Sequence, residues 1–94
     1  MDFIFEWDDA KAEKNTRNHE VSFDEAQTVF VDPLSVMKPD VEHSSHEERL
    51  LIIGTSHKHR VIVVSYTERG EIIRLISARK ATRHERKQYE EDNF

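Results

Sequence analysis

The stretch LLIIGTSHKHRVIVVSYTERGEIIRLISA, residues 50–78, decides the fold of this chain. Three segments within it, 50–55, 60–67 and 71–78, are rich in β-branched residues and are separated by short polar loops. This pattern is typical of three strands that pair as an antiparallel meander. Because apolar residues stand at consecutive positions in these segments, we expect the middle of the sheet to be covered on both faces.

The turn around Gly70 decides which side chains of the last two strands share a face. A two-residue turn before the third strand would set two glutamates directly opposite each other, which destabilises a strand pair. We therefore favour a three-residue loop in which Gly70 adopts the left-handed conformation. This register places Tyr66 opposite Ile72 and on the same face as Arg74, whereas Arg79 lies on the other face.

Helix signals flank the meander on both sides. The expected helices are one over roughly 9–19 capped by Asp8 or Asp9, one that starts after Ser22 and stops at Asp32-Pro33, and one that starts after Thr82 and reaches at least Tyr89. Ser22 and Thr82 are each followed three positions later by a glutamate, as in a capping box. The first of these helices has only a thin apolar stripe, so its packing should be light.

The remaining segments complete an α+β arrangement. An alternating first strand is expected at 3–7, a short strand at 34–37, and a polar loop at 39–48. The expected order is β-α-α-β-β-β-β-α, with an antiparallel sheet, two N-terminal helices and one C-terminal helix. A chain of 94 residues fits one domain, which we expect to span residues 1–94.

Composition narrows the setting in which the protein works. The chain has no cysteine, so disulfides and thiolate metal sites are excluded and a reducing compartment is suitable. The N-terminus lacks the features of a secretory signal, and no apolar run approaches the ~20 residues that span a bilayer. We expect a cytoplasmic protein without membrane contact.

Charge is divided unequally along the chain. The net charge is −5, but residues 1–48 hold 13 acidic against 4 basic residues, whereas residues 49–94 hold 10 basic against 6 acidic ones. The two parts therefore carry −9 and +4. Seven of the ten basic residues are arginines: Arg49, Arg60, Arg69, Arg74, Arg79, Arg83 and Arg86. Both signs can simply solvate a surface, but the planar guanidinium in a strand also suits phosphate recognition, and thus RNA.

An ordered set of motifs runs from Phe5 to Tyr89. These are Phe5-x-Trp7-Asp8-x-x-Lys11-Ala12-x-x-Asn15, Val21-Ser22-Phe23-x-Glu25-Ala26, Phe30-x-Asp32-Pro33, Glu47-Glu48-Arg49, Ile53-Gly54, Val64-x-Tyr66-Thr67, Ile76-Ser77-Ala78-Arg79 and Glu85-Arg86-x-x-Tyr89. Taken in order, they resemble the BrnT toxins of bacterial type II toxin–antitoxin systems. One departure is His59, because a glycine is expected before Arg60.

The resemblance implies a RelE-like fold and a metal-independent ribonuclease without a cofactor. It also implies a BrnA-type antitoxin that masks the toxin in a hetero-oligomer of two toxins and two antitoxins. In that complex the antitoxin would supply the contact with operator DNA.

Metal-free RNA cleavage needs a base, an acid, and cations that stabilise the phosphorane. The catalytic candidates are Arg79, Arg74, Tyr66, His19 and His43. The candidate RNA-binding residues are Arg60, Arg69, Arg83, Lys11 and Arg49. Arginines near strand ends offer fixed donors for phosphate, and histidines have a suitable ordinary pKa. A tyrosine is a poor base at neutral pH but can orient a group or donate a proton.

Structural interpretations of the same residues stay open. Arg74 can pair with an acid of the first half, Tyr66 can be a half-buried sheet residue, and Arg79 can cap the last helix. The loop pairs His43-x-x-His46 and His57-x-His59 lack the three or four ligands of a zinc site, so no metal is expected.

Two other classes of function compete with a ribonuclease. One is a non-catalytic module whose basic sheet binds an acidic protein partner. The other is a DNA-binding regulator. We disfavour it because no pair of the expected helices has the sequence pattern of a helix-turn-helix with a basic recognition face.

Overall fold

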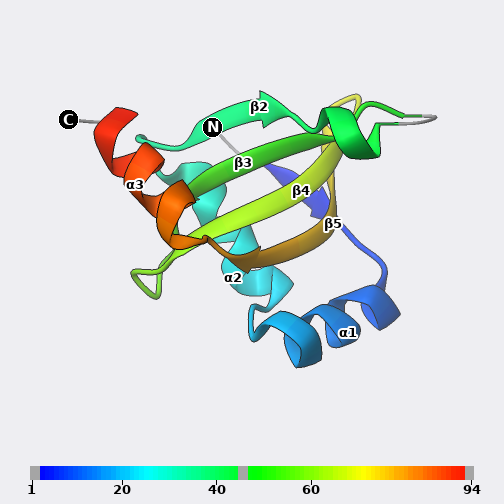
Figure 1. The fold of residues 1–94 in the computed structure, drawn as a ribbon. Coiled ribbons are helices and arrows are strands. Elements are labelled where there is room, and N and C mark those ends of the chain that lie inside the picture. Colours follow the sequence, from blue (N-terminus) through cyan, green and yellow to red (C-terminus); the bar gives the residue numbers. More distant parts are fainter. Residues whose placement is uncertain (1–2, 45–46, 93–94) are drawn as a thin grey trace.

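The computed structural model describes residues 3–44 and 47–92 (Figure 1). The strands are β1 (Ile4–Glu6), β2 (Val36–Pro39), β3 (Leu50–Thr55), β4 (Val61–Arg69) and β5 (Ile72–Lys80), the helices are α1 (Asp9–His19), α2 (Phe23–Thr28) and α3 (Arg83–Asp92), and two 3-10 turns are η1 (Val29–Val31) and η2 (Val41–His43). The expected mixed α+β architecture is confirmed. No helix in this part of the chain is long and apolar enough to cross a membrane.

The five strands form one sheet in the order β1-β5-β4-β3-β2. Strands β2 to β5 pair antiparallel, as expected for the meander, but β1 pairs with β5 in parallel. The expectation of a wholly antiparallel sheet is therefore wrong at this edge. Hairpin signals fix the direction of consecutive strands only, and β1 pairs with a strand that is distant in sequence.

The β4–β5 hairpin has a different register from the one expected. Gly70 has the predicted left-handed conformation, with φ of 62°. However, Arg69 pairs with Ile72, so the loop consists of two residues that start at the glycine. Tyr66 accordingly lies opposite Leu75 and not opposite Ile72. Glycine at the first central position of a primed turn explains this register, and it also keeps the glutamates apart.

Helices cover the two faces of the sheet unequally, as Figure 1 shows. The larger core packs residues of α2 and η1 against the sheet around Ile52, Val64 and Leu75. On the opposite face, Tyr89 of α3 packs with Ile53 and Val63. Cover on both faces is thus confirmed. On the second face, however, α3 lies over one end of the sheet only, and none of the described α-helices covers the other end.

Helix α1 docks on the sheet mainly through one polar side chain. Asn15 is the only buried residue of α1. Its Oδ1 accepts a hydrogen bond from Ala78 N at 3.0 Å, and its Nδ2 donates to Ala78 O at 2.8 Å and to Val21 O at 2.9 Å. Strand β1 pairs with β5 only from Ile72 to Arg74. Beyond Arg74 the edge of β5 has no neighbouring strand among the described residues, and the Asn15 amide supplies hydrogen bonds to it at Ala78.

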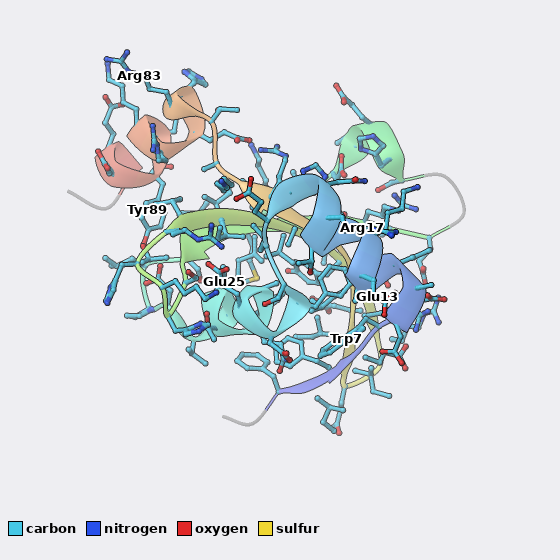
Figure 2. All side chains as sticks on the ribbon, turned by 90° about the horizontal axis from the view of Figure 1, so that it is seen from below. Trp7, Glu13, Arg17, Glu25, Arg83 and Tyr89 are labelled. Atoms are coloured by element: carbon cyan, nitrogen blue, oxygen red, sulfur yellow. The ribbon has the colours of Figure 1, made fainter. Side chains whose placement is uncertain are left out.

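A buried ion pair joins α2 to the start of β4. Glu25 is fully buried and lies in the interior in Figure 2. It accepts hydrogen bonds from Ser56 Oγ at 2.7 Å, from Arg60 Nε at 2.9 Å and from Arg60 Nη2. Burial alone would raise the pKa of Glu25, but the bonds from Arg60 and Ser56 outweigh it and lower the pKa.

Close packing explains the glycine of the Ile53-Gly54 motif. A Cβ atom at Gly54 would lie 3.0 Å from Asp32 Oδ2 and 3.0 Å from Val29 Cγ1. Asp32 Oδ2 at the same time accepts hydrogen bonds from Thr55 N at 2.8 Å and from the Tyr89 hydroxyl at 2.5 Å. The missing side chain therefore lets η1 and the start of the following loop approach the sheet.

Candidate active site

A β-bulge at Ile76 brings the arginines of β5 onto one face of the sheet. Before the bulge Arg74 pairs with Thr67, and after it Arg79 pairs with Val63. Thr67 and Val63 are four positions apart on β4 and lie on the same face, so both arginines do too. The expectation that the two arginines lie on opposite faces is wrong, because a bulge shifts the alternation by one residue.

Tyr66 lies on the opposite face, inside the main core. It is 1% exposed, and its ring makes an edge contact with Phe30 at 5.0 Å between centroids. Its hydroxyl donates to the sulfur of Met37 at 3.2 Å, and burial raises its pKa to about 12. The expected shared face of Tyr66 and Arg74 is therefore absent, and the structure does not bring this tyrosine to the arginines.

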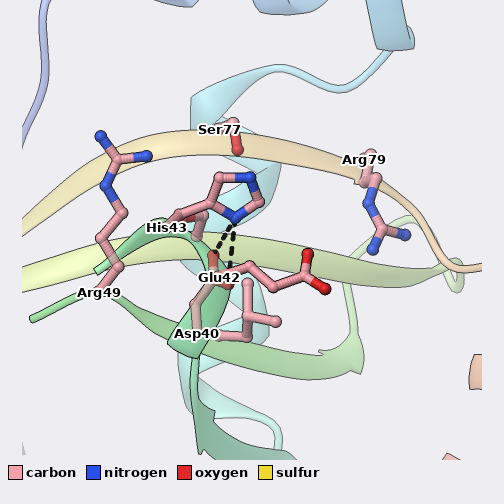
Figure 3. Close-up of a pocket in the computed structure, with 8 residues that line it drawn as sticks. Asp40, Glu42, His43, Arg49, Ser77 and Arg79 are labelled. Carbon is pink, nitrogen blue, oxygen red and sulfur yellow. Dashed lines mark hydrogen bonds and ion pairs between the residues drawn. The ribbon is translucent and has the colours of Figure 1, made fainter. Parts of the chain in front are cut away.

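The arginine face of the sheet is hollowed beneath the η2 turn. The cavity measures about 250 Å³ and is lined by Asp40, Glu42, His43, Arg49, Leu51, Ser65, Ser77 and Arg79. Figure 3 shows His43 between Arg49 and Arg79, near Ser77 on β5. The hollow thus brings together one catalytic histidine candidate, one catalytic arginine candidate and one candidate RNA-binding arginine.

His43 is held by an aspartate of the same turn. Its Nδ1 lies 3.0 and 3.1 Å from the two carboxylate oxygens of Asp40. The side chain of His43 is 62% exposed, whereas that of Asp40 is only 12% exposed. One ring nitrogen is therefore occupied by a sheltered carboxylate, and the rest of the imidazole is accessible from the hollow.

Backbone and hydroxyl hydrogen bonds tie the η2 turn to the start of β3. Asp40 N donates to Arg49 O at 2.8 Å. Ser44 Oγ donates to Asp40 O at 2.8 Å and accepts a hydrogen bond from Arg49 N at 2.9 Å. The histidine and one arginine of the hollow are thus positioned by the same small network.

Arg79 is positioned by a carboxylate from α3. Its Nη1 and Nη2 donate to the two carboxylate oxygens of Glu85 at 2.7 and 3.0 Å. These bonds lower the pKa of Glu85 to about 2 and raise the pKa of Arg79. Glu85 Oε1 also accepts from Thr82 N at 2.9 Å, which closes the predicted capping box. The guanidinium therefore has a fixed orientation at the end of β5.

Arg74 and Arg69 pair with acids of the first half of the chain. Arg74 Nη1 lies 3.3 Å from Glu6 Oε1, as the structural interpretation of this arginine anticipated. Arg69 Nε donates to Glu47 Oε2 at 3.2 Å. Both pairs are partly exposed to solvent, so they leave the arginines accessible to an anionic ligand that competes for them.

A second hollow adjoins the first at Ser77. It measures about 190 Å³ and is lined by Lys11, Lys14, Asn15, Asn18, His19, Ile76 and Ser77. Ser77 lines both hollows, so the hollow of His43 and the hollow of His19 share this serine. Both histidine candidates and Lys11 therefore line hollows that meet at Ser77.

Three predicted RNA-binding arginines, Arg60, Arg69 and Arg83, line neither hollow. Arg60 donates hydrogen bonds to the Glu25 carboxylate and, at 3.0 Å, to Glu20 O. Its guanidinium is therefore engaged in contacts within the protein. Arg83 is exposed at the first turn of α3, and Figure 2 shows it at the periphery of the molecule.

A family model described as the ribonuclease toxin, BrnT, of type II toxin-antitoxin system matches residues 7–85. The chain belongs to the BrnT toxin family. The resemblance seen in the motifs is thus confirmed, and membership gives the chain the role of a ribonuclease toxin with an antitoxin partner. No curated protein sequence matches the chain.

A solved BrnT structure has the same fold. The 1.1 Å crystal structure of the Brucella abortus ribonuclease toxin BrnT matches with a TM-score of 0.68 at 21% sequence identity. The match covers 87% of this chain and 100% of that chain. The five-stranded sheet with three helices is therefore a BrnT fold.

The residues of the first hollow that were not sequence-based candidates include Asp40 and Ser77. Asp40 could have been found from its spacing, because a carboxylate three positions before His43 in a tight turn can reach the imidazole. Ser77 belongs to the motif Ile76-Ser77-Ala78-Arg79, but its place between the two hollows depends on the bulge at Ile76, which the motif does not reveal.

Two histidine pairs, His43-x-x-His46 and His57-x-His59, were considered for metal binding. His46 lies outside the described residues. Within 3–44 and 47–92, no group of three or more His, Asp or Glu side chains is arranged to hold a metal ion.

Proposed function

We propose that the chain is a metal-independent endoribonuclease that acts at the surface around Ser77. The observation that carries this proposal is the shared hollow of His43, Arg49 and Arg79. An imidazole can accept a proton at neutral pH, and two guanidinium groups can hold a phosphate and stabilise its extra negative charge.

The reaction follows from the groups present. His43 removes the proton of a ribose 2′-hydroxyl, and the 2′-oxygen forms a bond to the adjacent phosphorus. The bond from phosphorus to the 5′-oxygen breaks, and protonated His19 supplies a proton to this leaving oxygen. The products are a 2′,3′-cyclic phosphate and a free 5′-hydroxyl.

The other candidate residues take supporting roles in this proposal. Arg79 and Arg49 stabilise the phosphorane, and Lys11 and Arg74 bind flanking phosphates. Tyr66 is buried in the core and Arg60 is bound by the buried Glu25, so we assign both to stability. Arg69 and Arg83 remain candidates for outer contacts with RNA.

Purified protein incubated with RNA in excess EDTA tests the proposal. We expect cleavage that leaves 2′,3′-cyclic phosphate ends, and we expect His43→Ala to lose about 10²- to 10⁴-fold in rate. His84→Ala is the matched control, because His84 is exposed on α3 and lines neither hollow. Intact RNA with wild-type protein would refute the proposal.

We further propose the finer features that the family suggests. These are a RelE-like fold within a single domain, 1–94, action on cytoplasmic RNA, and neutralisation by a BrnA-type antitoxin in a complex of two toxins and two antitoxins. Operator DNA would be bound only through the antitoxin. Co-expression with the product of the adjacent gene, followed by native mass spectrometry, tests the partner and the stoichiometry together.

A second candidate function is a non-catalytic module that binds an acidic protein. The bidentate contact of Arg79 with Glu85 supports it, because the arginine already holds a carboxylate. Arg79→Ala separates the two functions. Lost cleavage with retained affinity for the partner supports the ribonuclease, whereas lost affinity in a protein that never cleaved RNA supports the module.

A further inference from the structure

The geometry points to Asp40 as the positioning residue that fixes His43 with Nε2 as its proton acceptor in the hollow beside Ser77. This inference rests on the proposed ribonuclease function and deepens it, because it names the atom that takes the 2′-hydroxyl proton. Asp40 does not touch the RNA in this scheme and acts through His43.

The hydrogen-bond pattern selects the tautomer of the imidazole. An ionised carboxylate can only accept hydrogen bonds, so the ring nitrogen beside Asp40 must carry a hydrogen. That nitrogen is Nδ1, which lies 3.0 Å from Asp40 Oδ2 and 3.1 Å from Oδ1. In the neutral ring Nε2 is then unprotonated, and it is the nitrogen able to act as a base.

Burial and anchoring separate this contact from a chance pairing of surface charges. The Asp40 side chain is 12% exposed. Its backbone N–H donates a hydrogen bond to Arg49 O, and its backbone C=O accepts one from Ser44 Oγ. In the described part of the chain, His43 is the side chain that satisfies this carboxylate. Asp40 is thus a sheltered carboxylate on a fixed backbone that contacts the His43 ring.

The charges around His43 agree with a phosphate-cleaving site. Asp40, just before η2, and Glu42 within it bring negative charge, while Arg49 before β3 and Arg79 on β5 bring positive charge. Figure 3 shows the two arginines on either side of the ring. A phosphate held between them would place a ribose hydroxyl beside the imidazole, where proton transfer is needed.

The tautomer can be measured without RNA. In two-bond nitrogen–proton NMR spectra of labelled protein above the pH at which histidine titrates, we expect wild-type His43 to carry its proton on Nδ1. Asp40→Asn should lose this preference, because an amide can donate as well as accept. Glu42→Gln is the matched control for the tautomer, because it neutralises another carboxylate of the same turn.

Kinetics then distinguish positioning from a general loss of structure. We expect Asp40→Asn to lower kcat by about 10²- to 10⁴-fold with little change in KM. In a His43→Ala background the same substitution should have no further effect, because two residues that act as one unit are not additive. Asp40→Glu should restore part of the rate.

The outcomes separate this inference from the proposed function. A proton on Nε2 of His43, or an unchanged tautomer in Asp40→Asn, in a protein that cleaves RNA would overturn the inference alone. Additive losses of kcat in the double variant would do the same. Intact RNA with wild-type protein would overturn the ribonuclease proposal and, with it, the role of Asp40.

Discussion

His59 holds a backbone conformation that favours glycine. Its φ is 61°, at the position where the motifs lead one to expect glycine before Arg60. His59 N donates to Ser56 O at 2.9 Å and Ser56 N donates to Arg60 O at 2.8 Å, so the loop is a tight turn closed by a left-handed residue. The departure from the family pattern therefore keeps the turn but adds strain at one residue.

We expect His59→Gly to raise the free energy of unfolding by up to about 1 kcal/mol, because relief of the left-handed strain exceeds the added entropy of the unfolded chain. Chemical denaturation measures this change. Lys58→Gly is the control, since Lys58 has no positive φ and should lose about 0.5–1 kcal/mol. Equal losses in both variants would contradict the assignment of strain to His59.

Several single residues show why local patterns found only part of the site. Arg60 was an RNA-binding candidate, yet its partner Glu25 is 35 positions away and fully buried, which no local pattern reveals. Tyr66 was a catalytic candidate that the expected three-residue hairpin loop placed on the face of Arg74, but the observed two-residue loop puts the two side chains on opposite faces. By contrast, Arg79 and His43 do meet at one hollow, because a strand end and a polar loop are natural places for exposed polar groups.

Among the secondary-structure elements, local signals predicted boundaries well. The predicted bounds of α1 and β3 match those observed, and Ser22 and Thr82 cap α2 and α3 through Glu25 N and Glu85 N at 3.0 and 3.1 Å. The sequence did not reveal two features of the sheet, which are the parallel pairing of β1 with β5 and the bulge in β5. The first joins segments that are far apart in the chain, and the second is an inserted residue that strand alternation does not signal.

The docking of α1 depends on Asn15. We expect Asn15→Ala to lower the free energy of unfolding by about 2–4 kcal/mol, because it leaves the buried N–H and C=O of Ala78 without partners. Asn18→Ala on the exposed side of the same helix should change it by less than about 0.5 kcal/mol. Urea titration of both variants measures the difference, and equal effects would show that the amide does not hold the edge of β5.

The contact between α3 and β5 predicts a defined dependence of stability on pH. The pKa of Glu85 is about 2 in the folded protein, against an ordinary value of 4.5. The bond to Arg79 therefore stabilises the fold fully above pH 4.5, and this contribution decreases as the pH falls towards 2. We expect Glu85→Gln to cost on the order of 2 kcal/mol at neutral pH and progressively less in acid.

Unfolding measured from pH 6 to pH 2.5 in wild type and Glu85→Gln tests this dependence, because the other carboxylates cancel in the difference. Glu90→Gln, an exposed change on the same helix, is the control and should show no such trend. A difference between wild type and Glu85→Gln that does not vary with pH would contradict the coupling to Arg79.

Across the chain, the unequal division of charge has two uses. Acids of the first half pair with cations of the second: Glu6 with Arg74, Glu20 with Lys80, Glu25 with Arg60 and Glu47 with Arg69. Much of the +4 half is therefore used to hold the two halves together. The cations that line the two hollows at Ser77 are Arg49 and Arg79, together with Lys11 and Lys14 from the acidic half. Geometry, and not net charge, sets the proposed RNA surface.

This surface predicts how RNA binding responds to salt. If RNA crosses Ser77 from one hollow to the other, Lys11 and Lys14 contact phosphates, and each contact adds about 0.7 to the slope of log affinity against log salt for a single strand. We expect Lys11→Ala with Lys14→Ala, in a His43→Ala background that prevents cleavage, to make the slope shallower by about 1.4. Fluorescence anisotropy with labelled RNA measures it, and Lys87→Ala on α3 is the control with an unchanged slope. A shallower slope for Lys87→Ala, with none for the lysines of α1, would place the RNA over α3 and away from both histidines.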